Sequence, residues 1–396
     1  MHPSTPTYSA RSRAIEPFHV MALLARANEL QAVGHDVIHL EIGEPDFVTA
    51  APIIAAGQAA LAAGHTRYTA ARGLPQLREA ISAFYQQRYG LNIAPQRIMV
   101  TPGGSGALLL TTSLLVDPGK QWLMADPGYP CNRHFLRLIE ASAQLVPAGP
   151  EVRYQLTPEL IAQHWKTSTV GALLASPANP TGTLLSRAEL AAISQAVHAQ
   201  GGHLVVDEIY HGLTYGEDAA SVLEVDNEAF VLNSFSKYFG MTGWRLGWLV
   251  APEAAVPELE KLAQNLYISA SSMAQYAALA CFEPATIAIF EERRLAFAER
   301  RDFLLPALRD LGFKIAVEPQ GAFYLYADMS AFGGDAYAFC QHFLETEYVA
   351  MTPGLDFGKY QAQQHVRFAY TQNLSRLQQA VDRIARGLQS WRAKQS

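Results

Sequence analysis

Between residues 97 and 250, short apolar runs alternate with helical patterns, and this rhythm constrains the fold more than any other feature of the sequence. Each run has the length of a single strand, and helical patterns separate most of them. Strands that alternate with helices build a mostly parallel sheet with helices on both faces. Ligands of such sheets bind beyond the carboxyl ends of the strands. The expected strands are 98–101, 122–125, 145–146, 170–175, 203–207, 230–232 and 246–250.

The length of the chain predicts two domains. Its 396 residues and 43.3 kDa exceed one ordinary hydrophobic core. We expect a large α/β domain over residues 46–289, with a mostly parallel seven-stranded sheet. Residues 15–45 are too few for a core of their own, so we expect them to join 290–396 in a smaller α+β domain, with residues 1–14 as a loose arm. Helical patterns cover 17–33, 51–63, 75–89, 284–311, 335–346 and the end from 375, and strand patterns cover 37–41, 313–317, 322–327, 348–351 and 365–370.

Composition and charge argue against several classes of protein. A net charge of −6 without clusters gives no reason to expect nucleic acid or an anionic membrane as partner. No apolar run approaches the ~18 residues of a membrane span. Three widely spaced cysteines, Cys131, Cys281 and Cys340, argue against a metal site and a disulfide framework. The polar start lacks the apolar segment of a secretory signal, so we expect a cytoplasmic protein.

A lysine with unusual neighbours follows the expected strand at 230–232. Lys237 comes after two serines and before two aromatic residues, and Gly240, Gly243 and Gly247 punctuate the chain beyond it. An amine in such an apolar setting loses hydration, which lowers its pKa and makes it a nucleophile that can form a Schiff base. An exposed lysine on a turn explains the same local sequence.

Glycine-rich and aromatic turns follow two other expected strands. Gly103-Gly-Ser-Gly106 opens a helix after strand 98–101, and the free N–H groups of a helix N-terminus suit a phosphate. The turn is not a P-loop, because no Gly-Lys-Ser/Thr follows it, and a plain tight turn fits the same residues. Tyr129 follows strand 122–125 on a rigid Pro-Gly turn, where its ring either stacks on a planar ligand or packs on the surface.

Polar residues follow or interrupt three further apolar runs. Asn179 lies in Ser176-Pro-Ala-Asn-Pro180, whose prolines fix the backbone and predict one cis bond. Asp207 ends a buried strand, where a carboxylate is costly unless it meets a cation from a ligand or from a structural ion pair. Arg367 lies in the strand pattern 365–370, pointing away from its apolar neighbours, and either reaches solvent or binds a carboxylate with its planar fork.

Taken together, eight motifs resemble the fold-type I, pyridoxal-phosphate-dependent class I aminotransferases, specifically their bacterial aspartate-aminotransferase-like branch. Single motifs are weak, but eight in the right order over about residues 35 to 370 are very specific. The motifs are Gly43-Glu-Pro-Asp46, Tyr68 with Gly73-Leu74, Gly103-Gly-Ser-Gly106, Asp126-Pro-Gly-Tyr129, Asn179-Pro-Thr-Gly182, Asp207-Glu-Ile-Tyr210, Ser234-Phe-Ser-Lys237 with Arg245, and Val366-Arg-Phe368.

The resemblance implies which residues hold the cofactor, pyridoxal 5′-phosphate. Lys237 would carry it as a Schiff base, and Asp207 would pair with the pyridine nitrogen and keep it protonated. Asn179 and Tyr210 would hydrogen-bond its phenolic oxygen, and Tyr129 would stack on its ring. With Lys237 and Asp207, Tyr210 completes the expected catalytic set. The phosphate would be bound by Gly104, Ser105, Ser234 and Arg245, with Tyr68 reaching into the site of a partner subunit.

The resemblance also implies a substrate site, a reaction and an assembly. Arg367 would clamp the α-carboxylate of the substrate, close to the backbone of Gly43 and to Asn179. An amino acid would give its amine to the cofactor and leave as a 2-oxo acid, and a second 2-oxo acid would then take the amine. Lys237, once displaced, would move the proton at the substrate Cα. The implied assembly is a homodimer with its active sites at the interface.

Two other functions remain as alternatives. A C–S β-lyase or another eliminating enzyme would share the fold and cofactor, but Thr183-Leu-Leu185 stands where such relatives often carry an aromatic residue. A DNA-binding regulator would need a basic domain of ~70 residues ahead of the aminotransferase-like part. That part begins by about residue 15, so we expect no such domain.

The amino donor stays open at this stage. A dicarboxylic donor requires a cation, and Arg72, Arg133 and Arg137 are candidates that the sequence does not separate from other surface arginines. Aromatic residues near 322–326, which include Tyr324, leave room for aromatic or neutral aliphatic donors. The resemblance suggests 2-oxoglutarate as one acceptor.

Overall fold

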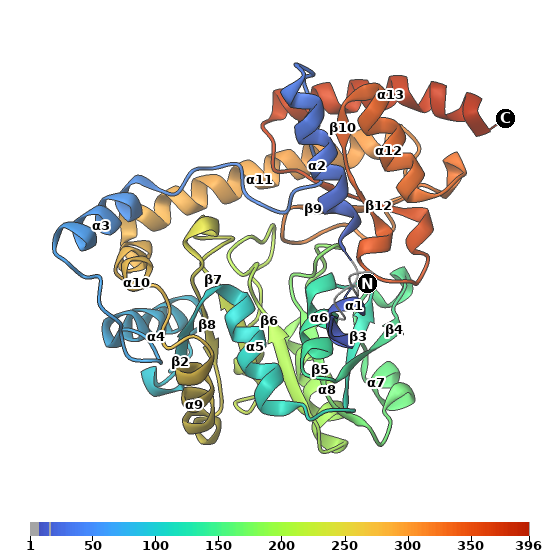
Figure 1. The fold of residues 1–396 in the computed structure, drawn as a ribbon. Helices are drawn as coiled ribbons and strands as arrows, with labels where there is room; N and C mark the ends of the chain where they lie inside the picture. Colours follow the sequence, from blue (N-terminus) through green and yellow to red (C-terminus); the bar gives the residue numbers. More distant parts are fainter. Residues whose placement is uncertain (1–7, 16, 396) are drawn as a thin grey trace, which may run out of the picture.

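A seven-stranded sheet forms the centre of the computed structural model, which describes residues 8–15 and 17–395 (Figure 1). Its strand order is β2-β8-β7-β6-β5-β3-β4, and all neighbours are parallel except β8, which is antiparallel to β2 and β7. This confirms the mostly parallel sheet. The strands are β2 (Ile98–Thr101), β3 (Gln121–Asp126), β4 (Ser142–Pro147), β5 (Thr169–Ala175), β6 (His203–Asp207), β7 (Phe230–Ser234) and β8 (Gly247–Val250).

Helices cover both faces of this sheet, which explains why its strands read as continuous apolar runs. In β6, Leu204 and Val206 belong to the same buried cluster as residues of α8, whereas Val205 belongs to a second cluster with residues of α5 and α9. Successive side chains of a strand point to opposite faces, so a strand covered on both sides must be apolar at every position.

Two small sheets bring the two ends of the chain together. β1 (Ile38–His39) pairs in parallel with β10 (Val349–Ala350). Beside them, β11, β12 and β9 form an antiparallel sheet. In Figure 1, α2 from the N-terminal part lies with α12 and α13 above the large sheet. The segments expected to share the smaller domain are therefore neighbours, although the domain boundaries stay a prediction. The antiparallel strands are β9 (Tyr324–Asp328), β11 (Thr352–Pro353) and β12 (His365–Ala369).

The helices agree with the expected helical ranges to within a few residues at each end, as is normal for helix termini. α2 and α4, for example, lie inside the ranges 17–33 and 75–89. The helices are α1 (Ala10–Arg13), α2 (His19–Ala32), α3 (Ala51–Ala62), α4 (Pro75–Tyr89), α5 (Gly103–Leu115), α6 (Pro130–Leu138), α7 (Pro158–His164), α8 (Arg187–Ala199), α9 (Val256–Leu266), α10 (Ser272–Ala278), α11 (Pro284–Asp310), α12 (Ala336–Glu347) and α13 (Leu374–Gln395).

Three details differ from the sequence-based expectation. Residues 313–317 form no strand, because only one isolated bridge joins Lys314 to Asp328. Within the expected loose arm, α1 is a short helix capped by Ser9, whereas residues 1–7 of that arm lie outside the described residues. The X-Pro bonds on both sides of Asn179 are cis, where one was expected, and so is the bond between Asp126 and Pro127.

Neither a single membrane-spanning helix nor a cluster of metal ligands occurs among the described residues. No single helix there is long and apolar enough to cross a membrane, although the pair Ser272–Phe282 and Pro284–Asp310, bent by 83°, passes the length and composition criteria when taken together. Across 8–15 and 17–395, no group of three or more His, Cys, Asp or Glu side chains could hold a metal ion. All three cysteines are free thiols.

A bidentate ion pair fastens the turn after β1 to the long helix α11. The Arg300 guanidinium donates to both carboxylate oxygens of Asp46, at 2.7 and 3.0 Å. It also lies 4.9 Å from the ring centre of Phe47 and 5.1 Å from that of Phe297. The Arg300 side chain is only 6% exposed, so water stabilises its positive charge little. The Asp46 carboxylate compensates that charge instead.

We predict that Asp46→Ala lowers the free energy of unfolding by about 3 kcal/mol, because it leaves the Arg300 charge buried without its partner. The thermal unfolding midpoint measures the effect. Arg26→Ala is the control, since it removes an exposed pair with Glu345 and should shift the midpoint far less. Equal shifts in the two variants would contradict the prediction.

Candidate active site

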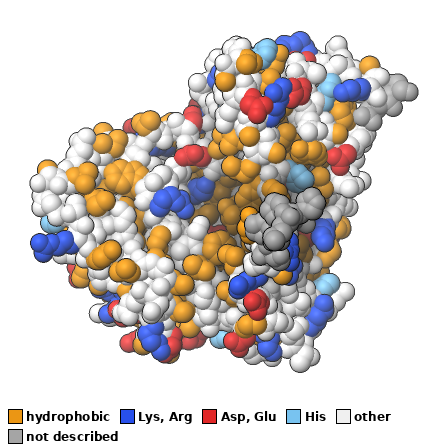
Figure 2. Space-filling model, in the orientation of Figure 1, with side chains coloured by type: hydrophobic (Ala, Val, Ile, Leu, Met, Phe, Trp, Pro, Cys, Tyr) orange, Lys and Arg blue, Asp and Glu red, His pale blue; other side chains and the backbone are white. Residues whose placement is uncertain are grey.

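Two neighbouring cavities lie where the large sheet meets the small sheets. The glycine-turn cavity, of about 390 Å³, is lined by Gly104, Ser105 and Arg245 among others, and the arginine cavity, of about 250 Å³, is lined by Arg367. Figure 2 shows a hollow with hydrophobic walls between the part that carries α2, α12 and α13 and the part that carries the large sheet. The two cavities share five lining residues: Gly43, Tyr129, Asp207, Ile209 and Lys237.

The glycine-turn cavity collects hydrogen-bond donors suited to a phosphate. Helix α5 begins at Gly103 without a side-chain cap, so the N–H groups of its first turn remain available and its dipole favours an anion. The Ser234 hydroxyl lies at the end of β7, 3.0 Å from the Ser236 hydroxyl, and both line the cavity. Arg245 adds a positive charge on the same side, with one hydrogen bond from Nη1 to the Thr242 carbonyl.

Two glycines allow this part of the cavity to assemble. A Cβ atom on Gly103 would lie 2.7 Å from the Arg245 guanidinium, and one on Gly247 would lie 2.7 and 2.8 Å from backbone atoms of Gly103 and Gly104. Gly103 also has a φ of +70°, a conformation that side chains other than glycine rarely adopt. Glycine at 103 and 247 therefore lets β8 and Arg245 approach the first turn of α5.

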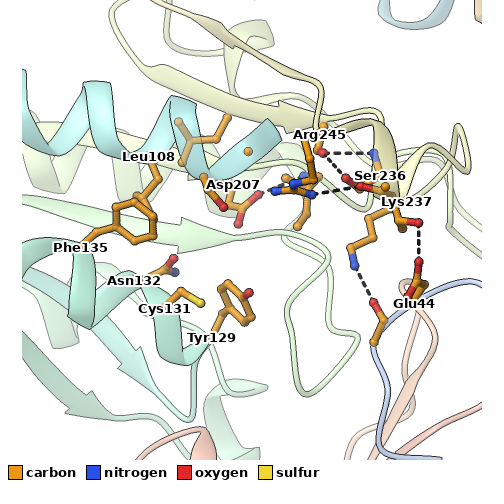
Figure 3. A pocket seen from close by; sticks show the side chains of 18 residues that line it. Glu44, Leu108, Tyr129, Cys131, Asn132, Phe135, Asp207, Ser236, Lys237 and Arg245 are labelled. Carbon is orange, nitrogen blue, oxygen red and sulfur yellow. Dashed lines mark hydrogen bonds between the residues drawn. The ribbon is translucent and has the colours of Figure 1, made fainter. Parts of the chain in front are cut away.

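Lys237 lies at the junction of the two cavities, as Figure 3 shows from the side of the glycine-turn cavity. Its amine donates to the Gly43 carbonyl at 2.6 Å and lies 5.6 Å from the ring centre of Tyr210. Burial, followed by the positive charge of Arg367, lowers the pKa of this amine to about 8. The expectation of a desolvated amine is therefore confirmed, and a substantial fraction is neutral near physiological pH.

Asp207 is a buried carboxylate at the carboxyl end of β6. Its Oδ1 accepts a hydrogen bond from the Ile209 N–H at 3.1 Å, and no salt bridge to it exists among the described residues. Burial raises the pKa of Asp207 to about 7, against the opposing effects of that N–H and of the Lys237 charge. Such a carboxylate is best satisfied by a ligand that brings a positively charged N–H group.

Arg367 is a buried guanidinium that faces the arginine cavity from β12. Its Nη1 donates to Asn179 Oδ1 at 2.9 Å, and its Nη2 donates to the Glu41 carbonyl at 2.6 Å. Its Nε is buried without a hydrogen-bond partner in the described part of the chain. All its acceptors are neutral, so the charge itself is uncompensated, which suits the binding of a carboxylate.

Two tyrosines connect the arginine cavity to Lys237. The hydroxyl groups of Tyr210 and Tyr324 are 2.8 Å apart, and the Tyr324 ring centre lies 4.3 Å from the Arg367 guanidinium. A Cβ atom on Gly43 would lie 2.3 Å from the Tyr324 hydroxyl, so this contact requires glycine at 43. The sequence placed Tyr324 only among the aromatic residues that leave room for the donor. It did not predict the contacts with Tyr210 and Arg367, because the residues of β9 read as an ordinary strand.

The structure brings nearly all expected site residues to these two cavities, and one stays apart. Tyr68 is 79% exposed and lines neither cavity within this single chain. The candidate arginines Arg72, Arg133 and Arg137 line neither cavity as well. Further lining residues that the sequence did not single out include Ser236, Thr242, Thr352, Asp356 and Phe357.

Fold and site together define an α/β protein whose adjoining cavities place a glycine turn suited to a phosphate beside a lysine amine and a buried carboxylate. The family described as "Aminotransferase class I and II" matches residues 35–384. The valine–pyruvate aminotransferase of Mycobacterium tuberculosis is 37% identical, over 95% of this chain and 97% of its own length.

Solved structures agree with this match. The crystal structure of an aminotransferase from Mycobacterium tuberculosis superimposes with a TM-score of 0.94 at 37% identity, covering 98% of this chain and all of the other. The Thermus thermophilus aspartate aminotransferase with maleate gives 0.91 at 33% identity, covering 97% of this chain and all of the other.

The chain therefore belongs to the class I and II aminotransferases, as its motifs predict. It is an enzyme that transfers an amino group between an amino acid and a 2-oxo acid with pyridoxal phosphate as cofactor. The residues present fit that cofactor, because the first turn of α5 with Arg245 offers donors for its phosphate. Asp207, buried and without an ion pair among the described residues, suits its protonated ring nitrogen.

We predict that Asp207→Asn stabilises the cofactor-free protein above pH 7. An unfolded Asp has a pKa of ~3.9. In the folded protein its pKa is about 7, so ionisation of Asp207 lowers the free energy of unfolding as the pH rises. This loss begins near pH 4 and is complete above about pH 7, where it is on the order of several kcal/mol. Thermal unfolding of both cofactor-free proteins between pH 5 and 8 measures the difference. It should grow with pH, and parallel pH profiles would contradict the prediction.

Proposed function

We propose that Lys237 holds pyridoxal phosphate through its amine and that Asp207 pairs with the ring nitrogen. One observation carries this assignment: the half-buried amine of Lys237 lies between a glycine turn suited to a phosphate on one side and an uncompensated guanidinium on the other. In the same assignment, Gly104, Ser105, Ser234 and Arg245 bind the phosphate and Tyr129 stacks on the ring. Asn179 and Tyr210 flank the phenolic oxygen from the arginine cavity.

The bound cofactor supplies an electron sink that stabilises negative charge at the substrate Cα. The protein contributes the proton transfer. When it is not bonded to the cofactor, the Lys237 amine would accept and return the Cα proton near neutral pH, because burial and the charge of Arg367 lower its pKa to about 8. Its short contact with the Gly43 carbonyl keeps the amine beside the arginine cavity, where the substrate binds.

Arg367 binds the α-carboxylate of the amino acid or 2-oxo acid in this proposal. The Asn179 side chain and the Glu41 carbonyl hold the plane of the guanidinium, so the fork is oriented before substrate arrives. A carboxylate so oriented places the substrate Cα between the fork and Lys237. This supports transamination, whose two half-reactions both use acids with an α-carboxylate.

We further propose a homodimer in the cytoplasm. Tyr68 supports the dimer, because its motif is expected to reach the partner's phosphate site and its ring is free at the surface of this chain. Cys281 and Cys340, buried as unpaired thiols, suit a reducing compartment. The relatives' names divide between valine–pyruvate and aspartate, so the names alone leave the donor undecided.

We predict that Lys237→Ala abolishes covalent attachment of the cofactor. Borohydride reduction followed by peptide mapping should find the cofactor on Lys237 in the parent protein and on no residue in the variant. The rate of amino transfer should fall by at least about 10²–10⁴-fold, since the positioned acid–base group is lost. Lys261→Ala is the control, because that lysine is exposed and lines neither cavity. A reduced adduct on another lysine would refute the assignment.

We predict that Tyr68 acts across the dimer. Tyr68→Ala should weaken cofactor binding about tenfold, the effect of one lost hydrogen bond to a charged group. Hybrid dimers of Tyr68→Ala and Lys237→Ala chains should regain one intact site each, because the Lys237→Ala chain supplies Tyr68 to its partner's lysine. Activity at limiting cofactor, with sedimentation to establish the dimer, measures this rescue. Activity no higher than that of the Tyr68→Ala protein would place Tyr68 in its own site.

A further inference from the structure

One wall of the arginine cavity is apolar and comes from the first turns of helix α2. Phe18 at its N-cap, then Val20, Met21 and Leu24, line the cavity opposite the tyrosine and arginine side. Met21 is 55% exposed, which is unusual for a methionine on a helix that packs against a core. This wall is defined here as the α2 wall.

Helix α2 has two apolar faces, and the protein core uses one of them. Leu23, Ala27 and Leu30 recur at helical spacing and are buried in the main core. The α2 wall lies on the neighbouring face, over the cavity, and its Phe18 also meets the His134 ring, with the ring centres 6.2 Å apart. A helix with a second apolar face that borders a cavity is suited to contact an apolar ligand.

Each charged side chain that lines the arginine cavity has a hydrogen-bond partner or a proposed role, although Glu41 Oε2 and Arg367 Nε are buried without a partner among the described residues. Lys237 and Asp207 serve the cofactor, and Arg367 serves the α-carboxylate. Glu41 accepts from the His39 ring at 2.7 Å, and both carboxylate oxygens of Asp356 accept backbone N–H groups. Among the residues that the structure places in this lining, no cation remains for a second carboxylate on the substrate.

Asp356 holds the α2 wall in position from the far end of the chain. It ends the short 3-10 helix η8 (Gly354–Asp356) and is 3% exposed. Its carboxylate accepts from the His19 N–H at 2.7 Å and from the Val20 N–H at 2.8 Å, which caps a helix start that has no side-chain cap of its own. The next residue, Phe357, lies 4.8 Å from the Arg367 guanidinium. Asp356 thus couples the α2 wall to the carboxylate-binding arginine.

We propose that the α2 wall is the binding surface for the side chain of an aliphatic amino donor such as leucine, and that Asp356 is the positioning residue that fixes this surface. The proposal rests on the assignment of Arg367 to the α-carboxylate. When the donor's α-carboxylate binds Arg367 and its Cα lies beside Lys237, the donor's side chain points to the α2 wall, which carries no charged side chain. The described residues of this chain offer nothing there to pair with the second carboxylate of an acidic donor.

Donor preference and binding of a non-reacting acid test the α2 wall directly. The ratio kcat/KM should favour leucine over alanine and over aspartate by about tenfold or more, the usual value of a few methylene groups in an apolar pocket. 4-Methylpentanoate, which lacks the amine, should bind more tightly than succinate when each is titrated against the cofactor-loaded protein. A preference for aspartate and succinate would overturn the proposal.

A matched pair of variants places a charge on α2 in two positions. Met21→Arg adds a cation to the α2 wall, so the preference for leucine over aspartate should fall about tenfold. Val33→Arg adds the same charge at the far end of the helix, on a residue that is 75% exposed and lines neither cavity. Its preference should change less than about twofold. Equal changes in both variants would contradict contact between Met21 and the donor.

Asp356→Asn tests the positioning role, with Asp335→Asn as the control because Asp335 caps α12 in the same way, away from the cavity. Asp356→Asn should raise KM for leucine about tenfold, leave KM for alanine within about twofold, and change kcat little. Equal KM increases for both donors would assign Asp356 a purely structural role.

If Arg367→Lys leaves KM unchanged for every donor, the assignment of Arg367 itself fails. The donor proposal alone fails if the Arg367 variant is impaired but leucine is not preferred.

Discussion

The buried guanidinium of Arg367 is the group on which the organisation of the site depends. A charge with no carboxylate partner among the described residues is expensive in a cavity, and the protein tolerates it by surrounding it with oriented dipoles. Those dipoles come from the Asn179 side chain and the Glu41 carbonyl, so the guanidinium joins the large sheet, the N-terminal segment and β12. The fold thereby keeps a strong carboxylate site open instead of closing it with an internal ion pair.

The same charge also tunes the reactive amine. Arg367 is the second cause, after burial, of the lowered pKa of Lys237, while Asp207 and Glu44 act in the opposite direction. A carboxylate bound to Arg367 would offset this repulsion and raise the basicity of the amine at the moment when it must accept a proton. In the proposed assignment, a substrate carboxylate bound to Arg367 would therefore favour acceptance of the proton by Lys237 through electrostatics alone.

The sequence predicts the reactive half of this site well, because that half is built from local patterns. The strands of the large sheet are short apolar runs, and Asp207, Lys237 and the Gly103 turn each follow such a run directly. The carboxyl ends of parallel strands meet at one edge, so their polar residues come together without further information. The strand prediction at 313–317 was wrong, because Phe313 and Ile315 pack into the core while only one isolated bridge, from Lys314 to Asp328, pairs the backbone.

The specificity half of the site depends on contacts between distant segments, and local patterns do not contain them. Phe18, Met21 and Leu24 read as part of one helical apolar stripe, yet the buried face of α2 is formed by Leu23, Ala27 and Leu30. Contacts with segments more than 300 residues away along the chain, which include β10, β11, α12 and η8, decide which face of α2 borders the cavity. The chemistry of an aminotransferase is thus readable from short motifs. Its donor preference is set by how the two ends of the chain pack together.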